Sequence, residues 1–320
     1  MNNDTKPVYI VTGAAGFLGN NVVRTQQGKG EIRALVLPTD EKIALDGLDC
    51  TIVVGNILVP STLEPLFEKT EGRPVYVIHC AGEVDIAAGY NISVYAVNVT
   101  GTRNVCQACL NHGAKLVYIS SVHAMTPVES QDGIEPAKSY DPDSVAGLYA
   151  KVKAEASKVV QDYVEKGLKA TLIQPSGLIG PYDYSNSNLS QFISEAASGK
   201  LPACVSEGYS FVDVRDAAKS IVSACENGKN GTSYILAGPT VSMMKLARLA
   251  AEDNGTKPVL LSVPIPLISL ITPITSAYYR LSRRKPLFTQ FALETLESPS
   301  NFNTESARED LGFISRPQCH

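Results

Sequence analysis

Three side chains of this 320-residue chain could together move a proton. Tyr149 and Lys153 lie four residues apart within a helical pattern, so they share one face of a helix. A free phenol has a pKa of about 10 and is a poor base at neutral pH, but a fixed ammonium beside it lowers that pKa. Such a phenol can exchange a proton with an alcohol or carbonyl oxygen. The Tyr-x-x-x-Lys spacing alone is weak, because helices also carry it by chance.

A serine hydroxyl strengthens this interpretation. Ser120 and Ser121 follow the apolar run Lys115–Ile119, which predicts a strand. Functional groups of an open α/β sheet gather at the carboxyl ends of its strands. A hydroxyl there can hydrogen-bond a substrate oxygen and orient it, although serine is also common in turns. A serine at this strand end, Ser120 or Ser121, together with Tyr149 and Lys153 about thirty residues later, predicts one catalytic site.

A glycine-rich turn, Thr12–Gly19, lies between the first apolar run and the first helical pattern. Gly13 permits a tight turn, Gly16 has no Cβ to block a pyrophosphate, and Gly19 lets the helix pack closely on the strand. The helix N-terminus offers free N–H groups and a partial positive charge to phosphates. The turn therefore predicts a dinucleotide-binding site.

The elements that must position these groups alternate between strand and helix. Apolar, β-branched runs predict strands at Val8–Thr12, Ile32–Leu37, Thr51–Val54, Val75–His79, Lys115–Ile119 and Ala170–Ile173, with a later one at Tyr234–Ala237. Helical spacing predicts helices at Phe17–Gln27, Ser61–Lys69, Val94–His112, Ser144–Lys166 and Ser242–Glu252. This alternation predicts an α/β fold, a Rossmann-type doubly wound parallel sheet with its ligand crevice at the carboxyl ends of the strands.

The regular alternation ends after Pro175. Segment Gly177–Asn188 is rich in Gly, Pro, Ser, Tyr and Asn and predicts a loop. We expect residues 1–176 and 211–237 to form a dinucleotide-binding domain, and residues 177–210 and 238–320 to form a smaller C-terminal substrate-binding lobe. The apolar stretch Val263–Ala277 contains three prolines and is too short to span a bilayer. It is compatible with a lid, a membrane-surface contact or plain core.

Composition excludes several classes of protein. Hydrophobic residues are 44% and charged residues 19%, as in soluble globular proteins and unlike disordered or fibrous chains. A net charge of −4 gives no electrostatic reason to expect nucleic acid or an anionic membrane as partner. Seven scattered cysteines do not predict a disulfide framework, and Cys106 and Cys109 read as buried thiols. The polar residues 1–7 do not resemble a signal peptide, so we expect a cytoplasmic protein.

The motifs, taken in order, resemble the extended short-chain dehydrogenase/reductases, also called the NAD-dependent epimerase/dehydratase family. The turn Thr12–Gly19 is similar to the family's TGxxGxxG. Five further motifs occur in the family's order over nearly the whole chain: Gly55-Asn56-Ile57, His79-Cys80-Ala81-Gly82, Asn98–Asn104, Pro175–Pro181 and Phe211–Asp216. The C-terminal segments Val263–Thr289 and Phe302–Gly312 resemble the dihydroflavonol-reductase-like and 3β-hydroxysteroid-dehydrogenase-like branches.

The resemblance implies a role for each candidate residue. Tyr149 would be the acid/base, Lys153 would hold the ribose and tune Tyr149, and Ser121 would orient the substrate oxygen. A nicotinamide dinucleotide would exchange hydride at C4. No metal is implied. The cofactor-binding residues that the resemblance implies are Gly13, Gly16, Phe17, Leu18, Gly19, Asn56, Ile57, Cys80, Ala81, Gly82, Asn98, Tyr149, Lys153, Pro175, Ser176, Gly177 and Leu178.

Some positions depart from the family pattern. Asn56 stands where an acid usually contacts the adenine, and Gln174 stands where an arginine is usual. The second predicted strand ends in Val36-Leu37-Pro38, which supplies neither an acid for a ribose hydroxyl nor an arginine for a 2′-phosphate. Asp40 is a candidate for contact with a ribose hydroxyl, and Lys42 is a candidate for contact with a 2′-phosphate. The sequence therefore leaves NAD or NADP as the cofactor undecided.

The residue types that are absent near the predicted site indicate the class of reaction. Val122–Met125, after Ser121, holds no carboxylate pair of the kind that sugar dehydratases use. Segment Tyr182–Ser210 has only Lys200 as a cation to hold a diphosphate, and instead carries Tyr182, Tyr184, Phe192 and Tyr209. His123 either touches substrate or packs as a capping residue. We predict an NAD(P)-dependent oxidoreductase that interconverts a ketone and a secondary alcohol on a bulky, mostly apolar or aromatic small molecule.

Two alternative functions remain open at this point. One is a nucleotide-sugar 4-epimerase that uses the same three residues through transient oxidation. The other is a non-catalytic dinucleotide sensor, although such relatives typically lack the tyrosine or lysine that this chain keeps. The sequence leaves the oligomeric state open, with a homodimer as one option.

Overall fold

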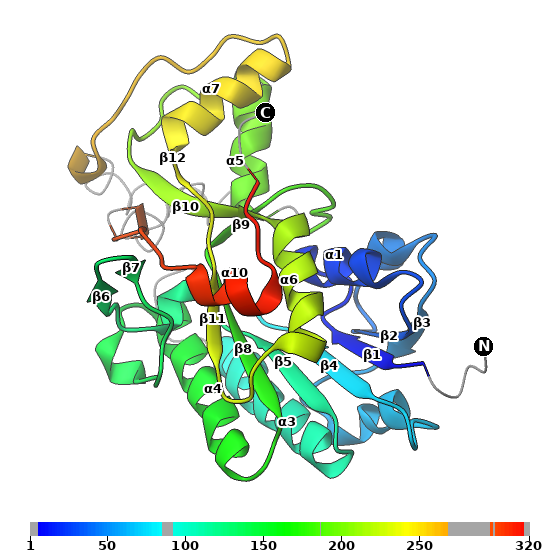
Figure 1. The fold of residues 1–320 in the computed structure, drawn as a ribbon. Helices are drawn as coiled ribbons and strands as arrows, with labels where there is room; N and C mark the ends of the chain where they lie inside the picture. Colours follow the sequence, from blue (N-terminus) through cyan, green and yellow to red (C-terminus); the bar gives the residue numbers. More distant parts are fainter. Residues whose placement is uncertain (1–5, 85–91, 186, 268–294, 297, 317–320) are drawn as a thin grey trace.

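A parallel sheet of seven strands forms the centre of the molecule (Figure 1). The structure is a computed structural model and describes residues 6–84, 92–185, 187–267, 295–296 and 298–316. The strands run in the order β11-β8-β5-β4-β1-β2-β3. Their bounds are β1 Val8–Thr12, β2 Glu31–Val36, β3 Thr51–Val54, β4 Val75–His79, β5 Lys115–Ile119, β8 Ala170–Pro175 and β11 Ser233–Leu236. The strand order reverses at β1 and β4, which puts a ligand crevice at their carboxyl ends.

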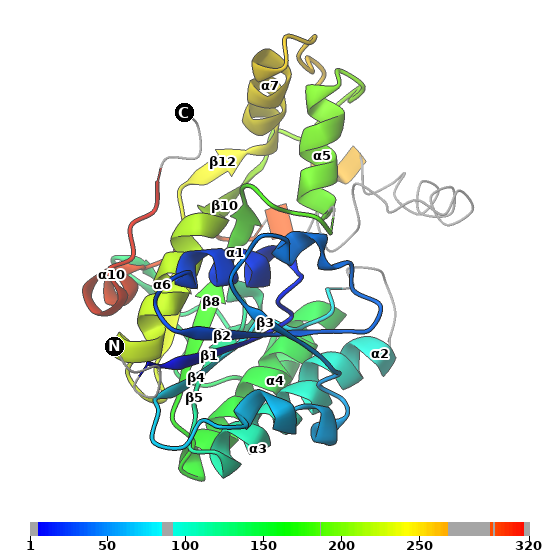
Figure 2. The same ribbon diagram turned by 90° about the vertical axis from the view of Figure 1, so that its right-hand side faces the viewer.

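Helices cover both faces of this sheet (Figure 2). Helices α1 (Phe17–Gln26) and α6 (Val214–Asn227) pack together on one face, and α3 (Thr102–Asn111) and α4 (Leu148–Glu165) on the other. The pleat of β1 divides the core between them: Val8 and Ile10 join the α3/α4 side, whereas Tyr9 and Val11 join the α1/α6 side. The predicted α/β doubly wound sheet is confirmed.

Local backbone chemistry explains where the predicted helices differ. Two short 3-10 turns, η3 (Pro60–Thr62) and η4 (Glu64–Phe67), replace the helix expected at Ser61–Lys69, because Pro65 lacks the N–H that a continuous helix would need there. Helix α4 begins at Leu148 instead of Ser144, since Gly147 adopts a φ of 86°.

The helix expected at Val94–His112 is divided into three parts. A first turn, α2 (Ile92–Tyr95), runs into a π-helix, η5 (Ala96–Gly101), and then into α3. A π-helical turn inserts an extra residue and often marks a functional site. Here it carries Asn98, one of the expected cofactor-binding residues.

A second, three-stranded sheet lies beyond the carboxyl ends of the main one. It contains β9 (Gly177–Ile179), β10 (Gly208–Asp213) and β12 (Thr240–Ser242), with β10 between the other two. Helices α5 (Asn188–Ala197) and α7 (Met243–Asp253) pack side by side next to it. Segment Gly177–Asn188 is thus not entirely a loop, since its first residues pair with β10 as strand β9. The division of the chain into two domains stays a prediction.

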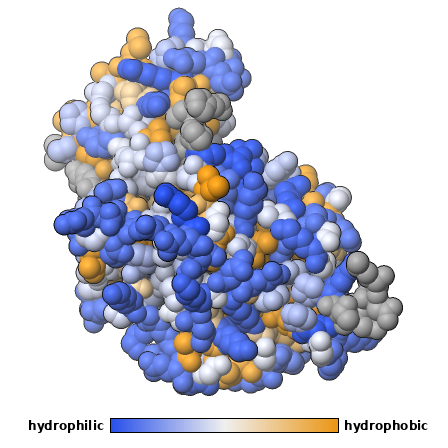
Figure 3. All heavy atoms as spheres, viewed as in Figure 1, coloured by the Kyte–Doolittle hydropathy of each residue, from blue (hydrophilic) through white to orange (hydrophobic). Residues whose placement is uncertain are grey.

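Small elements complete the edges. The hairpin of β6 (Glu129–Ser130) and β7 (Gly133–Ile134) lies outside both larger sheets, and α10 (Glu305–Leu311) packs on α6 and on the edge strand β11. At the opposite edge, β3 is only four residues long, with Ile52 and Val54 exposed. The face seen in Figure 3 is mostly hydrophilic, with scattered apolar residues.

The cysteines and the apolar late stretch can be compared with their predictions. The six cysteines that lie in the described part of the chain are free thiols, and Cys106 and Cys109 are completely buried, as expected. Of the stretch Val263–Ala277, only residues 263–267 belong to the part that the structure describes, and the rest of that prediction lies outside it. Within the described residues, none of the helices is both long and apolar enough to cross a membrane.

Candidate functional site

The glycine turn after β1 is packed so tightly that two of its positions accept only glycine. Gly13 has a φ of 65°, and a Cβ there would lie 2.7 Å from the Ala81 backbone after β4. A Cβ on Gly19 would lie 2.1 Å from the Gly13 carbonyl oxygen. Gly16 differs, because that oxygen, at 3.2 Å, is the one described atom within 4 Å of a Cβ at this position. Space is therefore kept beside Gly16, where a phosphate would approach.

The start of α1 suits an anion. The N–H groups of Phe17, Leu18 and Gly19 belong to the first helical turn, which has no intrahelical acceptors for them. No side chain caps this end, and the first turn holds no acidic residue. The open Gly16 position and these uncapped donors together fit the pyrophosphate of a dinucleotide.

Two asparagines join this helix to the chain that follows β9. Asn20 Nδ2 donates to the Tyr182 carbonyl oxygen (3.0 Å), and Asn21 Nδ2 donates to the Pro181 carbonyl oxygen (3.2 Å). Tyr182 adopts a φ of 70°, and the Arg24 guanidinium lies 4.0 Å above its ring. The end of the Pro175–Pro181 motif is thus anchored to the helix that follows the glycine turn.

The Pro175–Leu178 segment leaves the main sheet at its carboxyl edge. Pro175 ends β8, the Ser176 N–H bonds the Leu236 carbonyl oxygen, and Gly177 and Leu178 lie in β9. A Cβ on Gly177 would lie 2.6 Å from the Phe211 ring. These expected cofactor-binding residues therefore lie at the same end of the sheet as the glycine turn.

A chain of hydrogen bonds with one direction runs under the crevice. The Ala81 N–H donates to Thr12 Oγ1 (3.3 Å), and Thr12 Oγ1 lies 2.7 Å from His79 Nδ1. His79 Nε2 lies 3.0 Å from Thr102 Oγ1, which donates to the Asn98 carbonyl oxygen. Because the Thr102 hydroxyl donates its hydrogen to that carbonyl, it can only accept a hydrogen bond from His79. His79 Nε2 therefore carries the ring hydrogen, and Nδ1 accepts a hydrogen bond from the Thr12 hydroxyl. Burial and Lys153 lower the pKa of His79 to about 3, so the ring is neutral.

Asn98 holds the strand end above this chain. Its Nδ2 donates to the carbonyl oxygens of Glu83 and Val94, whereas its buried Oδ1 has no partner among the described residues. A Cβ on Gly82 would lie 2.9 Å from that oxygen and 3.5 Å from Lys153 Nζ. Asn98, Gly82 and Lys153 therefore meet at one point of the crevice, as expected for a shared cofactor contact.

The remaining expected cofactor-binding residues form hydrogen bonds within the protein. Asn56 Oδ1 accepts the Leu58 N–H at 2.9 Å, and the Ile57 carbonyl oxygen accepts Asn104 Nδ2 at 2.9 Å. The Cys80 N–H donates to the Thr12 carbonyl oxygen. Gln174, in place of the usual arginine, is fully buried and donates to Tyr140 Oη. The two departures from the family pattern thus have local structural partners.

The three residues predicted to move a proton do come together. Ser121 follows β5, and its hydroxyl lies beside the phenol of Tyr149 in the first turn of α4. One turn later, Lys153 is 7% exposed, and its Nζ donates to the Ile119 carbonyl oxygen at 2.9 Å. Ser120 instead bonds Ser157 on α4 and points into the core. The choice of Ser121 over Ser120 agrees with this geometry.

The electrostatics differ from the expectation for the tyrosine. Burial raises the pKa of Tyr149, and the neighbouring Ser121 hydroxyl only partly offsets this. The sequence predicted a pKa lowered by Lys153, but in this structure the pKa is raised, because desolvation of the phenolate is the larger effect. Burial also lowers the pKa of Lys153 to about 8. The phenol is protonated at neutral pH and can act as an acid.

Tyr209, which the sequence placed only in an aromatic segment, lies beside these residues. Its hydroxyl is 3.1 Å from Nε2 of His123, and the two rings stack with centroids 5.6 Å apart. The His123 ring in turn meets the Tyr149 ring edge-on. The order of strands β9, β10 and β12 brings Tyr209 there, and no spacing in the sequence could have shown it.

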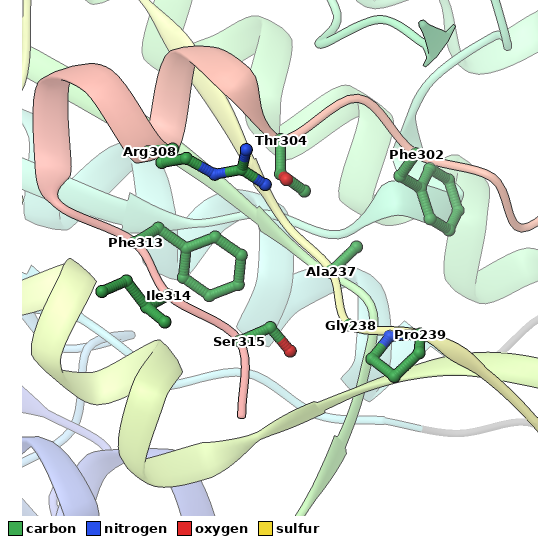
Figure 4. A pocket seen from close by; sticks show the side chains of 9 residues that line it. All are labelled: Ala237, Gly238, Pro239, Phe302, Thr304, Arg308, Phe313, Ile314 and Ser315. Carbon is green, nitrogen blue, oxygen red and sulfur yellow. The ribbon is translucent and has the colours of Figure 1, made fainter. Parts of the chain in front are cut away.

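A separate hollow of about 390 Å³ lies outside this crevice (Figure 4). It lies between the end of β11, α10 and the chain after it, where Phe302, Thr304 and Arg308 face Pro239 and Ser315. It contains none of the residues predicted for catalysis. Within the described residues, no cluster of His, Cys, Asp or Glu is placed to hold a metal ion.

The sequence as a whole matches a known family model. Residues 9–237 match the model of the NAD dependent epimerase/dehydratase family. The chain belongs to this family. It is an oxidoreductase of this NAD-dependent family.

Relatives of this epimerase/dehydratase family member have diverse described activities. Sterol demethylase protein B of Methylococcus capsulatus is 26% identical over 95% of this chain and 93% of its own. Ceramide reductase of Caulobacter vibrioides is 27% identical over 90% and 83%. The crystal structure of gox2253 is 30% identical, with a TM-score of 0.79 over 97% of this chain and 94% of that one. Two dTDP-glucose 4,6-dehydratases are also similar.

Proposed function

We propose that this protein reduces a ketone to a secondary alcohol, or oxidises the alcohol, on a bulky, mostly apolar molecule. The observation that carries the proposal is the position of the Ser121 hydroxyl, at the carboxyl end of β5, beside the Tyr149 phenol, with Lys153 buried one helical turn away. The open Gly16 position at the start of α1 supports a dinucleotide in the same crevice.

The side chains divide the work of reduction. When bound, the dihydronicotinamide supplies a hydride to the carbonyl carbon. Tyr149, whose pKa burial raises, donates its proton to the carbonyl oxygen. The Ser121 hydroxyl hydrogen-bonds the same oxygen and holds it near the phenol. Lys153 contributes positive charge beneath the site, which favours the phenolate left after the proton has moved.

The surroundings of Ser121 support an apolar substrate. Val122, Met125, Phe192 and Tyr209 belong to one apolar cluster beside the second sheet. Lys200, the lone cation of segment 182–210, is exposed just past the end of α5. A diphosphate would lack a partner in that segment. The names of the sterol and ceramide relatives point in the same direction.

We infer that NAD is preferred over NADP. The Asp40 carboxylate accepts the Leu37 N–H at 2.8 Å, just past the end of β2. An acid at this end of the second strand suits a ribose hydroxyl and repels a 2′-phosphate. Arg24, the cation of α1, is committed to the Ala44 carbonyl oxygen and the Tyr182 ring.

A cofactor-absorbance assay tests the proposed activity. Purified protein is incubated with NADH or NADPH and a panel of steroidal, aromatic and aliphatic ketones. We expect turnover with at least one bulky ketone. Tyr149→Phe should retain cofactor affinity and lose turnover by about a hundredfold or more. Full turnover in that variant would contradict the role of Tyr149.

The 4-epimerase alternative has a different outcome in the same assay. A nucleotide-sugar epimerase would interconvert a uridine diphosphate-sugar with no net change in cofactor absorbance. Product analysis by chromatography separates the two reactions. Sugar interconversion together with inactivity on all the ketones would replace the proposed function.

A further inference from the structure

His123 contacts both groups that would handle the substrate oxygen. It lies in the 3-10 turn η6 (Val122–Ala124), and its backbone N–H donates to Ser121 Oγ at 3.2 Å. Its ring meets the Tyr149 ring edge-on, with centroids 6.4 Å apart and planes at 67°. The orientation of one imidazole is therefore coupled to the orientation of the phenol, while its main chain fixes the serine.

Tyr209 holds that imidazole from the other side of the crevice. Its hydroxyl is 3.1 Å from His123 Nε2, and the planes of the two rings differ by only 7°. Tyr209 is 4% exposed and stands in the middle strand of the second sheet, opposite Val241 of β12. Its ring also packs edge-on against Phe211. A phenol fixed by this much packing is a rigid anchor.

We propose that His123 and Tyr209 form a positioning pair that sets the orientation of Tyr149 and Ser121 toward the substrate oxygen. The inference rests on the proposed acid role of Tyr149. It gives the second sheet a part in catalysis beyond lining the substrate space, because its central strand then fixes the catalytic phenol through one imidazole.

The charge state of the pair suits this task. Burial lowers the pKa of His123 to about 4, so at neutral pH the ring has one donor and one acceptor nitrogen. Among the described residues, the phenols of Tyr149 and Tyr209 face it, and burial raises the pKa of both. A neutral imidazole orients Tyr149 without adding a second cation to the one that Lys153 supplies.

Plain core packing makes a different prediction. Phenylalanine at position 209 keeps the stacked ring and loses only the hydroxyl that bonds Nε2. If the pair serves only packing, Tyr209→Phe leaves the reaction unchanged. If it positions the phenol, the loss appears in kcat, because a misaligned proton donor slows the chemical step more than it weakens substrate binding.

The test compares Tyr209→Phe with a matched control. Tyr163→Phe, at the far end of α4, also removes a phenol hydrogen bond of 3.1 Å, to Gln107 Oε1. We expect Tyr209→Phe to lower kcat about five- to tenfold, with KM and cofactor affinity within about twofold of wild type. Tyr163→Phe should stay within about twofold in all three. A kcat for Tyr209→Phe equal to that of the control overturns the proposal.

A double-mutant cycle tests whether the two residues act as one unit. His123→Phe keeps an aromatic edge near Tyr149 and loses the bond to Tyr209. Its kcat should fall as far as that of Tyr209→Phe, and the double variant should fall no further. Multiplicative losses in the double variant contradict a shared function.

Nitrogen NMR of the imidazole separates this proposal from the proposed reaction. In the wild type, the His123 ring should be neutral with a titration midpoint near pH 4, and its signals are assigned by their loss in His123→Phe. Tyr209→Phe should shift the Nε2 resonance by removing its partner. An unchanged resonance overturns the pairing, whichever substrate the enzyme takes. If the resonance shifts but the protein is inactive on ketones, the pairing of His123 with Tyr209 is supported and the proposed reaction is not. The kcat values of the variants are then compared with the nucleotide-sugar as substrate.

Discussion

At the scale of single residues, two histidines, the buried His79 and the partly buried His123, are held uncharged. The bonds of His79 to Thr12 and Thr102 leave Nδ1 as an acceptor, so a second proton on the ring would face a hydroxyl that already donates to it. His123 is uncharged because its ring is removed from water. Both rings bind protons less readily in the folded protein than in the unfolded chain, whose histidines titrate near 6.5.

This arrangement predicts a loss of stability in mild acid. The folded pKa values, about 3 for His79 and about 4 for His123, lie below the unfolded value. Their stabilisation is therefore fully present above pH 6.5 and is lost as the pH falls toward 4. Each histidine contributes a slope that approaches about 1.4 kcal/mol per pH unit in that window. Urea unfolding at pH 7.5, 6.5, 5.5 and 5 measures it.

The variant that tests this is His79→Gln, which should reduce the slope by roughly one proton. The carboxylates with lowered pKa, such as Glu31 and Asp213, titrate below this window. A free energy of unfolding that does not change between pH 7 and pH 5 would contradict the claim that the two rings are held neutral.

The glycine turn gives a second residue-scale prediction. Gly16→Val should weaken dinucleotide binding by at least about tenfold, because the side chain fills the approach to the free N–H groups of α1. The fold should survive, since Gly16 has an extended backbone that valine also adopts. Gly13→Val should instead destabilise the fold, because its φ is positive and its Cβ would clash with Ala81. Calorimetry with NADH and thermal unfolding separate the two effects.

Residue types and spacing indicate which residues of the site to consider. A strand end and a helix face predict that Ser121 and Tyr149 lie near each other, and the structure places them side by side. The balance that raises the pKa of Tyr149 did not follow, because desolvation depends on burial by residues distant in sequence. The contact of His123 with Tyr209 was equally invisible, since 86 residues separate them.

At the scale of elements, the end of β2 decides which cofactor fits. The Asp40 side chain folds back onto the Leu37 N–H and keeps a carboxylate at this strand end. Asp40→Ala should therefore narrow the preference for NADH over NADPH by about tenfold or more, mainly through the KM for NADPH. Asp49→Ala, on the following loop, is the control. An unchanged ratio of kcat/KM for the two cofactors would contradict the role of Asp40.

Periodic elements were predictable and irregular ones were not. β1, β3, β4 and β5 begin and end where their apolar runs do, because each is a short buried or edge strand bounded by turn residues. The π-helix η5 was missed, since its extra residue leaves the apolar pattern of Val94–His112 nearly intact. Helix α5 was missed because the polar residues before it indicated only a loop, although Ser187 caps its N-terminus.

At the scale of the whole molecule, the end of the chain is tied back to the centre. The Arg316 guanidinium donates to both carboxylate oxygens of Asp216 in the first turn of α6, and its backbone N–H donates to the same group. Asp216 is 6% exposed, so these charge-assisted bonds are shielded from water on one side. They fix the segment after α10 against the helix that packs on α1.

Removing this tie should loosen the terminal segment. Arg316→Ala should lower the free energy of unfolding by about 1 kcal/mol, because Asp216 keeps its charge in a buried place and loses its partner. The Arg316 side chain is partly exposed, and solvent screening keeps the effect modest. Arg308→Ala, an exposed cation of α10, is the control in urea unfolding. Equal stabilities of the two variants would contradict the tie.

The two edge strands of the large sheet differ in how readily they could pair with a strand of another copy. β11 is shielded by α10, but β3 offers its outer backbone groups to any strand from another copy. Four residues allow few inter-chain bonds, so its shortness guards against fibril growth despite the bare Ile52 and Val54. An insertion that lengthened β3 would allow more inter-chain hydrogen bonds and so would promote aggregation.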